Sequence, residues 1–87
     1  MEKFLIGQIL KIVSDIDLYI DNLQQMSGTR RITEYLNIEH DMGKYHAFIE
    51  CLEEINLDEF VRIHNLTNQK VNNALKKLEE IYQYMMQ

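Results

Sequence analysis

The chain has no proline and only three glycines, Gly7, Gly28 and Gly43, among its 87 residues. Tight hairpins and irregular loops depend on these two residue types, because glycine reaches positive φ angles and proline pre-sets a turn. Their scarcity excludes a protein built from many short strands. It also leaves few loops from which a concave active site could be assembled. We therefore expect a few long helices and a function other than catalysis.

Cysteine is nearly absent as well, since Cys51 is the only one and so forms no disulfide within the chain. No run of apolar residues is longer than three, which is too short for a membrane span or for the apolar region of a signal peptide. These absences favour a cytoplasmic protein in a reducing compartment, with no membrane as a partner.

Basic residues are in short supply, because nine Lys and Arg stand against fourteen Asp and Glu, a net charge of −5. Non-specific binding of nucleic acid requires the opposite balance. The acidic excess lies entirely before residue 56, where ten acidic residues oppose five basic ones, while residues 56–87 hold four of each. Any contact with nucleic acid should therefore fall in the last third of the chain.

The composition that is present is typical of a small globular domain, with 46% apolar and 26% charged residues. We interpret residues 1–87 as a single all-α domain. A chain of this length buries only about 60–65% of the surface that it exposes when unfolded, so its core is marginal. Association with a partner or with a second copy is therefore expected.

The helical spacing of apolar residues predicts a first long helical region from about residue 2 to about residue 25. Gly28 should end this region in the left-handed conformation, and Thr29 should cap the helix that follows. The predicted buried stripe consists of Leu5, Ile9, Ile12, Ile16, Tyr19, Leu23 and Met26, broadened by Ile6, Val13 and Ile20.

A second helical region is predicted from about residue 30 to about residue 55. Three apolar residues near its start, Ile32, Tyr35 and Leu36, are offset from the rest of its stripe, and Gly43 interrupts it. This pattern predicts a bend or a short separate first segment. The residues that follow the helical spacing are Ile38, Met42, Tyr45, Ile49 and Leu52.

The third region begins near Asn56, which can cap a helix with Glu59 as its partner three residues later. It admits two interpretations. In one, a break at Asn65 and a cap at Thr67 divide it into two helices. In the other it is a single rod, whose stripe is Phe60, Ile63, Thr67, Val71, Ala74, Leu78, Ile81 and Met85.

The segment Leu57 to Leu78, LDEFVRIHNLTNQKVNNALKKL, resembles a helix-turn-helix. The resemblance implies that Val61 faces the partner helix, that Asn65 and Leu66 make the turn, and that the second helix enters the DNA major groove. Two departures weaken it: Asn65 stands where glycine is usual, and no hairpin of a winged variant follows. The residues implied for bases are Asn68, Gln69, Asn72 and Asn73, and those for phosphates are Lys70, Lys76 and Lys77.

The same residues also fit a plain amphipathic helix. Its buried side would be Val71, Ala74, Leu75 and Leu78, and its solvent face would be rich in amides and lysines. This alternative requires no break at Asn65. The path of the backbone from residue 64 to residue 67 discriminates between the two interpretations.

One face of the second region carries Glu39, His46, Glu50 and Glu53 at helical spacing. We interpret it as a solvated acidic face. The acid-x-x-His pairs of di-metal bundles and the closely spaced Cys and His ligands of zinc sites are missing from the sequence. No metal and no cofactor are therefore expected.

Glu50-x-x-Glu53 is similar to the acidic helices of all-α nucleotide pyrophosphatases. Their magnesium chemistry needs a second acidic motif, and the adjacent Glu79 and Glu80 point in different directions around a helix. Cys51 lacks an orienting partner and is expected to be an inert, partly buried thiol. We expect neither enzymatic activity nor a small-molecule substrate.

Two groups of apolar residues fall outside the predicted core and are candidate interface residues. Tyrosine and methionine suit adaptable protein contacts. We predict a small acidic regulatory or inhibitory module that docks amphipathic helices onto a protein partner, as a homodimer. The alternative is a helix-turn-helix transcriptional regulator that dimerises through its first two helical regions. The candidate interface residues are Phe4, Leu10, Leu18, Tyr82, Tyr84, Met85 and Met86.

Overall fold

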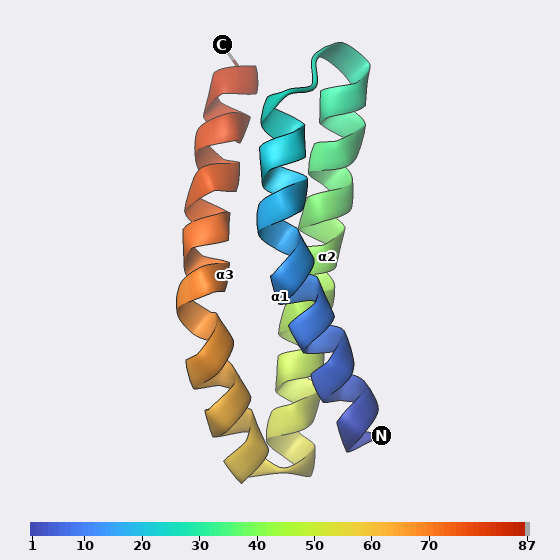
Figure 1. Cartoon of the computed structure of the whole chain (residues 1–87), viewed down its shortest axis with the longest axis vertical. Helices are drawn as coiled ribbons and strands as arrows, with labels where there is room; N and C mark the ends of the chain where they lie inside the picture. The colour runs from blue at the N-terminus through green and yellow to red at the C-terminus, as the bar shows by residue number, and fades with distance from the viewer. Residues whose placement is uncertain (87) are drawn as a thin grey trace.

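The computed structural model describes residues 1–86, which form three α-helices and no strand. The helices are α1 (Glu2–Gln24), α2 (Gly28–Ile55) and α3 (Leu57–Met85). They run up, down and up along a bundle of 43 × 20 × 17 Å, so the two termini lie at opposite ends of it (Figure 1). The predicted all-α bundle of three long helical regions is thereby confirmed.

The connections between the helices are short. Residues 25–27 join α1 to α2, and Gly28 adopts the expected left-handed conformation with a φ of 63°. The predicted cap at Thr29 is wrong, because α2 already begins at Gly28 and Thr29 lies within its first turn. Ser27 holds the N-cap position instead and makes no capping hydrogen bond with its side chain.

Asn56 alone joins α2 to α3 and makes two contacts with its side chain. Its Oδ1 accepts a hydrogen bond of 3.2 Å from the backbone amide of Glu59, which confirms the predicted cap. Its Nδ2 donates a hydrogen bond of 3.1 Å to Oε1 of Glu2, at the start of α1. One residue therefore starts α3 and ties the α2–α3 hairpin to α1.

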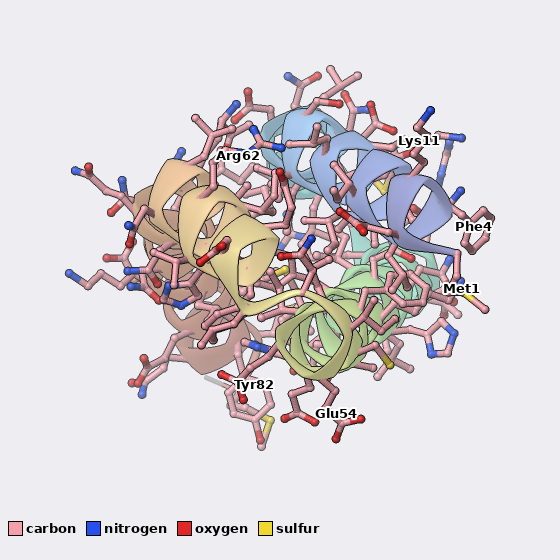
Figure 2. All side chains as sticks on the ribbon, turned by 90° about the horizontal axis from the view of Figure 1, so that it is seen from below. Met1, Phe4, Lys11, Glu54, Arg62 and Tyr82 are labelled. Atoms are coloured by element: carbon pink, nitrogen blue, oxygen red, sulfur yellow. The ribbon has the colours of Figure 1, made fainter. Side chains whose placement is uncertain are left out.

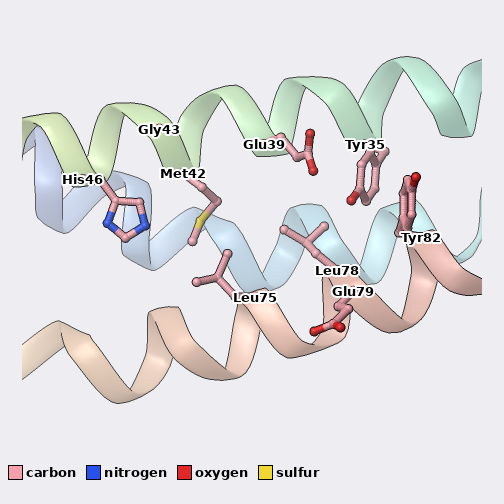
Figure 3. A pocket seen from close by; sticks show the side chains of 9 residues that line it. All are labelled: Tyr35, Glu39, Met42, Gly43, His46, Leu75, Leu78, Glu79 and Tyr82. Atoms are coloured by element: carbon pink, nitrogen blue, oxygen red, sulfur yellow. The ribbon is translucent and has the colours of Figure 1, made fainter.

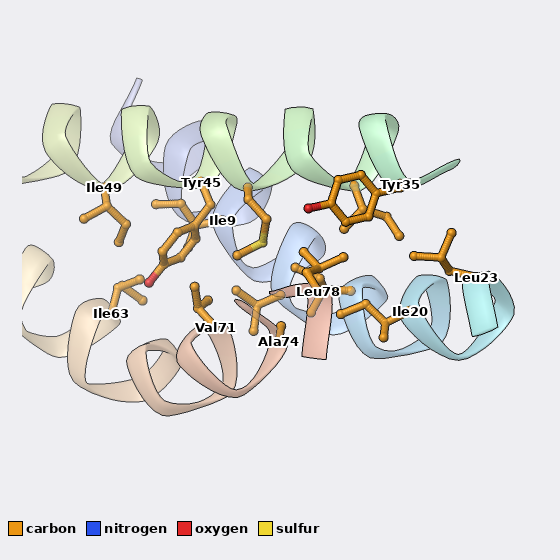
Figure 4. Close-up of a cluster of buried hydrophobic side chains, with 14 of the residues drawn as sticks. Ile9, Ile20, Leu23, Tyr35, Tyr45, Ile49, Ile63, Val71, Ala74 and Leu78 are labelled. Carbon is orange, nitrogen blue, oxygen red and sulfur yellow. The ribbon is translucent and has the colours of Figure 1, made fainter. Parts of the chain in front are cut away.

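The core runs along the length of the bundle between the three helices (Figures 2 and 4). Every residue predicted for the stripe of α2 is buried, and so is most of the single-rod stripe of α3. In α1 the stripe follows Val13 and Ile20, whereas Tyr19 is 40% exposed. The buried residues of α1 are Leu5, Ile9, Val13, Ile16, Ile20 and Leu23.

The second helix is a single element from end to end, so the predicted separate first segment is wrong. Tyr35 turns into the core, whereas Ile32 and Leu36 are exposed. Leu36 follows Tyr35 directly, and successive residues in a helix point about 100° apart. Of these three offset residues, only Tyr35 therefore belongs to the buried stripe of α2. Within residues 1–86, no helix has both the length and the apolar character needed to cross a membrane.

The backbone of α3 continues without a break through residues 64–67, so the two-helix interpretation is wrong. Thr67 does not cap a second helix. It lies in the middle of α3, and its hydroxyl donates a 2.8 Å hydrogen bond to the carbonyl oxygen of Ile63 one turn earlier. Val61, which the helix-turn-helix would turn toward its partner, is 47% exposed.

Candidate functional site

The candidate interface residues do not form one surface. Phe4, Leu10 and Leu18 are exposed on α1, and Tyr82, Tyr84 and Met86 are exposed around the end of α3, while Met85 packs partly against the core. Phe4 lies in the first turn of α1 at one end of the bundle, and the residues after position 81 lie at the other end (Figure 1). An end-on view also places Phe4 and Tyr82 on different sides (Figure 2).

The residues implied for DNA contact are all exposed along α3. Asn72 donates a 3.3 Å hydrogen bond to Asn68 within the helix, and the ammonium of Lys70 lies 3.9 Å from the carboxylate of Asp17 on α1. Because α3 is continuous, these side chains form the outer face of a bundle helix and lack the turn that presents a recognition helix. The others are Gln69, Asn73, Lys76 and Lys77.

Two further expectations concern α2. Among residues 1–86 no group of three or more His, Cys, Asp or Glu side chains is placed to hold a metal ion.

Cys51 is exposed, so the prediction of a partly buried thiol is wrong. The reason is its neighbours, since Ile49 and Leu52 take the inward positions of that turn and leave Cys51 facing solvent.

A groove of about 650 Å³ lies between α2 and α3, and we call it the α2–α3 groove (Figure 3). Helical spacing brings its lining residues together, because side chains three or four positions apart share a face. Gly43 contributes no side chain, and the space beside its Cα is empty. Tyr35, Glu39, Met42, Gly43 and His46 line it from α2, and Leu75, Leu78, Glu79 and Tyr82 line it from α3.

The floor of the groove is apolar and its rim is acidic. Met42 and Leu78 are buried at the floor, and Leu75 is 38% exposed beside them. Glu39 and Glu79 are exposed and stand on opposite walls at a similar level along the groove (Figure 3). Among these nine lining residues there is no lysine or arginine. The groove thus combines apolar surface that gains from being covered with carboxylates that attract cations.

Two tyrosines close one end of the groove. The rings of Tyr35 and Tyr82 lie 6.0 Å apart between centroids, tilted by 32°. His46 lies at the other end (Figure 3). Burial, together with the hydrogen bond and the negative charge of Glu39, raises the pKa of Tyr35 from 10.0 to about 12. The site therefore disfavours additional negative charge.

We expect a phenol in the folded protein to titrate near pH 12, as followed by absorbance at 295 nm, and Tyr35→Phe to remove that phase. The folded state keeps this proton above pH 10 while the unfolded chain loses it, so stability present below pH 10 should fall as the pH approaches 12. Glu39→Gln should lower the pKa only in part, because burial is the larger cause. An unchanged titration in Tyr35→Phe contradicts this assignment.

The α2–α3 groove was not predicted from the sequence, although its parts were visible there. Met42 was assigned to the predicted stripe and Tyr35 to a position offset from it, while Glu39 and His46 were assigned to a solvated face. The available signal was Leu75 and Tyr82, which are seven residues apart and so extend the stripe of α3 on one side. Whether another helix covers that flank depends on packing between helices.

The comparison with known proteins leaves the groove as the main guide to function. No protein-family model, curated protein or solved structure matches the chain. The groove carries an apolar floor, a carboxylate on each of its two walls and an aromatic end wall. These are the properties of a binding surface.

Proposed function

We propose that this protein is a small regulatory interaction module that binds a protein partner through the α2–α3 groove. The observation that carries the proposal is apolar surface left uncovered along a groove between two helices. Leu75 and Tyr82 are 38% and 46% exposed there, directly beside the buried Met42 and Leu78. Tyrosine side chains such as that of Tyr82 are enriched at protein interfaces.

A regulatory role is supported by the effect that binding would have on both proteins. A bundle with a marginal core gains stability from any partner that binds only its folded state. The partner in turn has its own surface covered, which is how a small binding module masks or recruits a target. The exposed groove residues are few, so affinity should depend on Leu75 and its neighbours near the centre.

A photo-crosslinking amino acid at position 75, in the cells that make the protein, tests the proposal. We expect adducts with one partner from position 75 and none from a matched position at Ser14, which is exposed on α1. The partner is then purified and titrated. Leu75→Glu should weaken its binding at least tenfold, about 1.4 kcal/mol, because a charge then opposes the apolar floor.

Leu75→Glu should fold normally, since residue 75 is partly exposed, and circular dichroism checks this. Identical adducts from positions 75 and 14, no adduct from position 75, or a partner whose affinity ignores Leu75→Glu would each rule out the groove as the binding surface.

A further inference from the structure

The shape of the α2–α3 groove suits one helix. Its two walls are antiparallel helices, and α1 lies behind them (Figure 3). Tyr35 and His46, which mark its two ends, are eleven positions apart on α2, or about 16 Å along the helix axis at about 1.5 Å per residue. That length corresponds to about three turns of a docked helix. Side chains of such a helix pack into the furrow between two neighbouring helices.

The charges around the groove specify what flanks the apolar stripe of that helix. Glu39 and Glu79 stand on opposite walls, so a helix lying between them has one carboxylate on each flank. The nine lining residues include no lysine or arginine that neutralises these carboxylates. The negative charge of Glu39 contributes to the raised pKa of Tyr35, although burial is the larger cause.

Two copies of this chain make a poor match for each other at this site. Docked groove to groove, they would bring four carboxylates, two from each copy, into one apolar interface. Like charges placed together in an interface disfavour association. A partner with basic flanks has the complementary charge.

We propose that the α2–α3 groove binds one amphipathic helix of another protein, about three turns long, whose apolar stripe is flanked on both sides by lysine or arginine. This inference rests on the proposed function and names the chemistry of its partner. Docking converts the three-helix bundle into a four-helix arrangement in which the new helix covers Leu75 and Tyr82.

The test uses the full chain and two fluorescein-labelled peptides of 18 residues. Both carry leucine at the seam positions of a heptad. One has lysine at the flanking positions and its twin has glutamate there. By fluorescence anisotropy at low salt, we expect the lysine peptide to bind at least tenfold more tightly than its twin, and the difference to shrink as salt is added.

Charge reversal in the protein makes the test specific for the groove. Glu39→Lys with Glu79→Lys should reverse the preference, so that the glutamate peptide binds more tightly. The control is Asp21→Lys with Glu54→Lys, which changes the net charge equally at two exposed residues outside the groove. The control should leave the lysine peptide preferred.

Several results overturn the inference. Equal binding of the two peptides, no binding of either, or a reversal in the control variant each do so. Sedimentation of a wild-type dimer that Leu75→Glu dissociates also does so, because a second copy then fills the groove. If neither peptide binds but position 75 still crosslinks to one partner, the groove binds a protein of different chemistry. The proposed function then stands without this inference.

Discussion

Ile38→Ala should lower the free energy of unfolding by about 2–5 kcal/mol, because Ile38 is only 2% exposed in the centre of the bundle. The truncated side chain removes buried apolar surface and leaves a cavity that neighbouring residues fill only partly. A chain of this length is expected to have about 4–13 kcal/mol of stability in total. This one substitution therefore removes a large part of it.

Ile32→Ala is the matched control. Ile32 lies on the same helix and is the same residue type, but it is 51% exposed. Both substitutions change helix propensity by the same amount, so the difference between them measures burial alone. We expect Ile32→Ala to change stability by no more than about 0.5 kcal/mol. Urea unfolding followed by circular dichroism should show a lower midpoint for Ile38→Ala with an unchanged slope. Equal losses at the two positions would contradict the assigned core.

The helices were largely predictable because their apolar stripes are local patterns. Ile38, Met42, Tyr45, Ile49 and Leu52 follow helical spacing on α2, and all five are buried. The connections between the helices were also predictable from local residues. Gly28 adopts the left-handed conformation and Asn56 caps α3, as their residue types allow. Spacing along one helix is sufficient for such assignments, since each depends on residues within one or two turns.

The continuity of α3 was not predictable in the same way. A threonine can cap a new helix, or it can bond to the carbonyl one turn earlier inside a helix, and the local sequence permits both. Inside the bundle the hydroxyl of Thr67 also lies 2.7 Å from that of Tyr45, which is 22 positions away, and such a contact is not visible in the local sequence. Similarly, the α2–α3 groove depends on how two helices pack together. Neither stripe contains that information.

The pair of Tyr45 and Thr67 gives a second prediction, in which the two single substitutions differ. The hydroxyl of Thr67 donates its one proton to the carbonyl oxygen of Ile63, so the hydroxyl of Tyr45 donates to Thr67. Thr67→Val removes the acceptor and leaves the phenol of Tyr45, only 3% exposed, without a partner. Its expected cost is about 1–3 kcal/mol.

Tyr45→Phe should cost less, about 0.5–1.5 kcal/mol, because Thr67 keeps its bond to Ile63 and no buried group loses its only partner. The double variant should be more stable than Thr67→Val alone, since phenylalanine beside valine leaves no polar atom unpaired. Urea unfolding of the four proteins gives the coupling energy directly.

If the losses simply add, the two hydroxyls do not interact in the folded protein. If they are coupled as expected, this polar pair favours one alignment of α2 against α3, because sliding either helix by one turn would bury both hydroxyls without each other. The walls of the α2–α3 groove come from those same two helices. In that alignment Glu39 and Glu79 lie at a similar level on the two walls, so the buried pair also affects the arrangement of charges that a partner helix would meet.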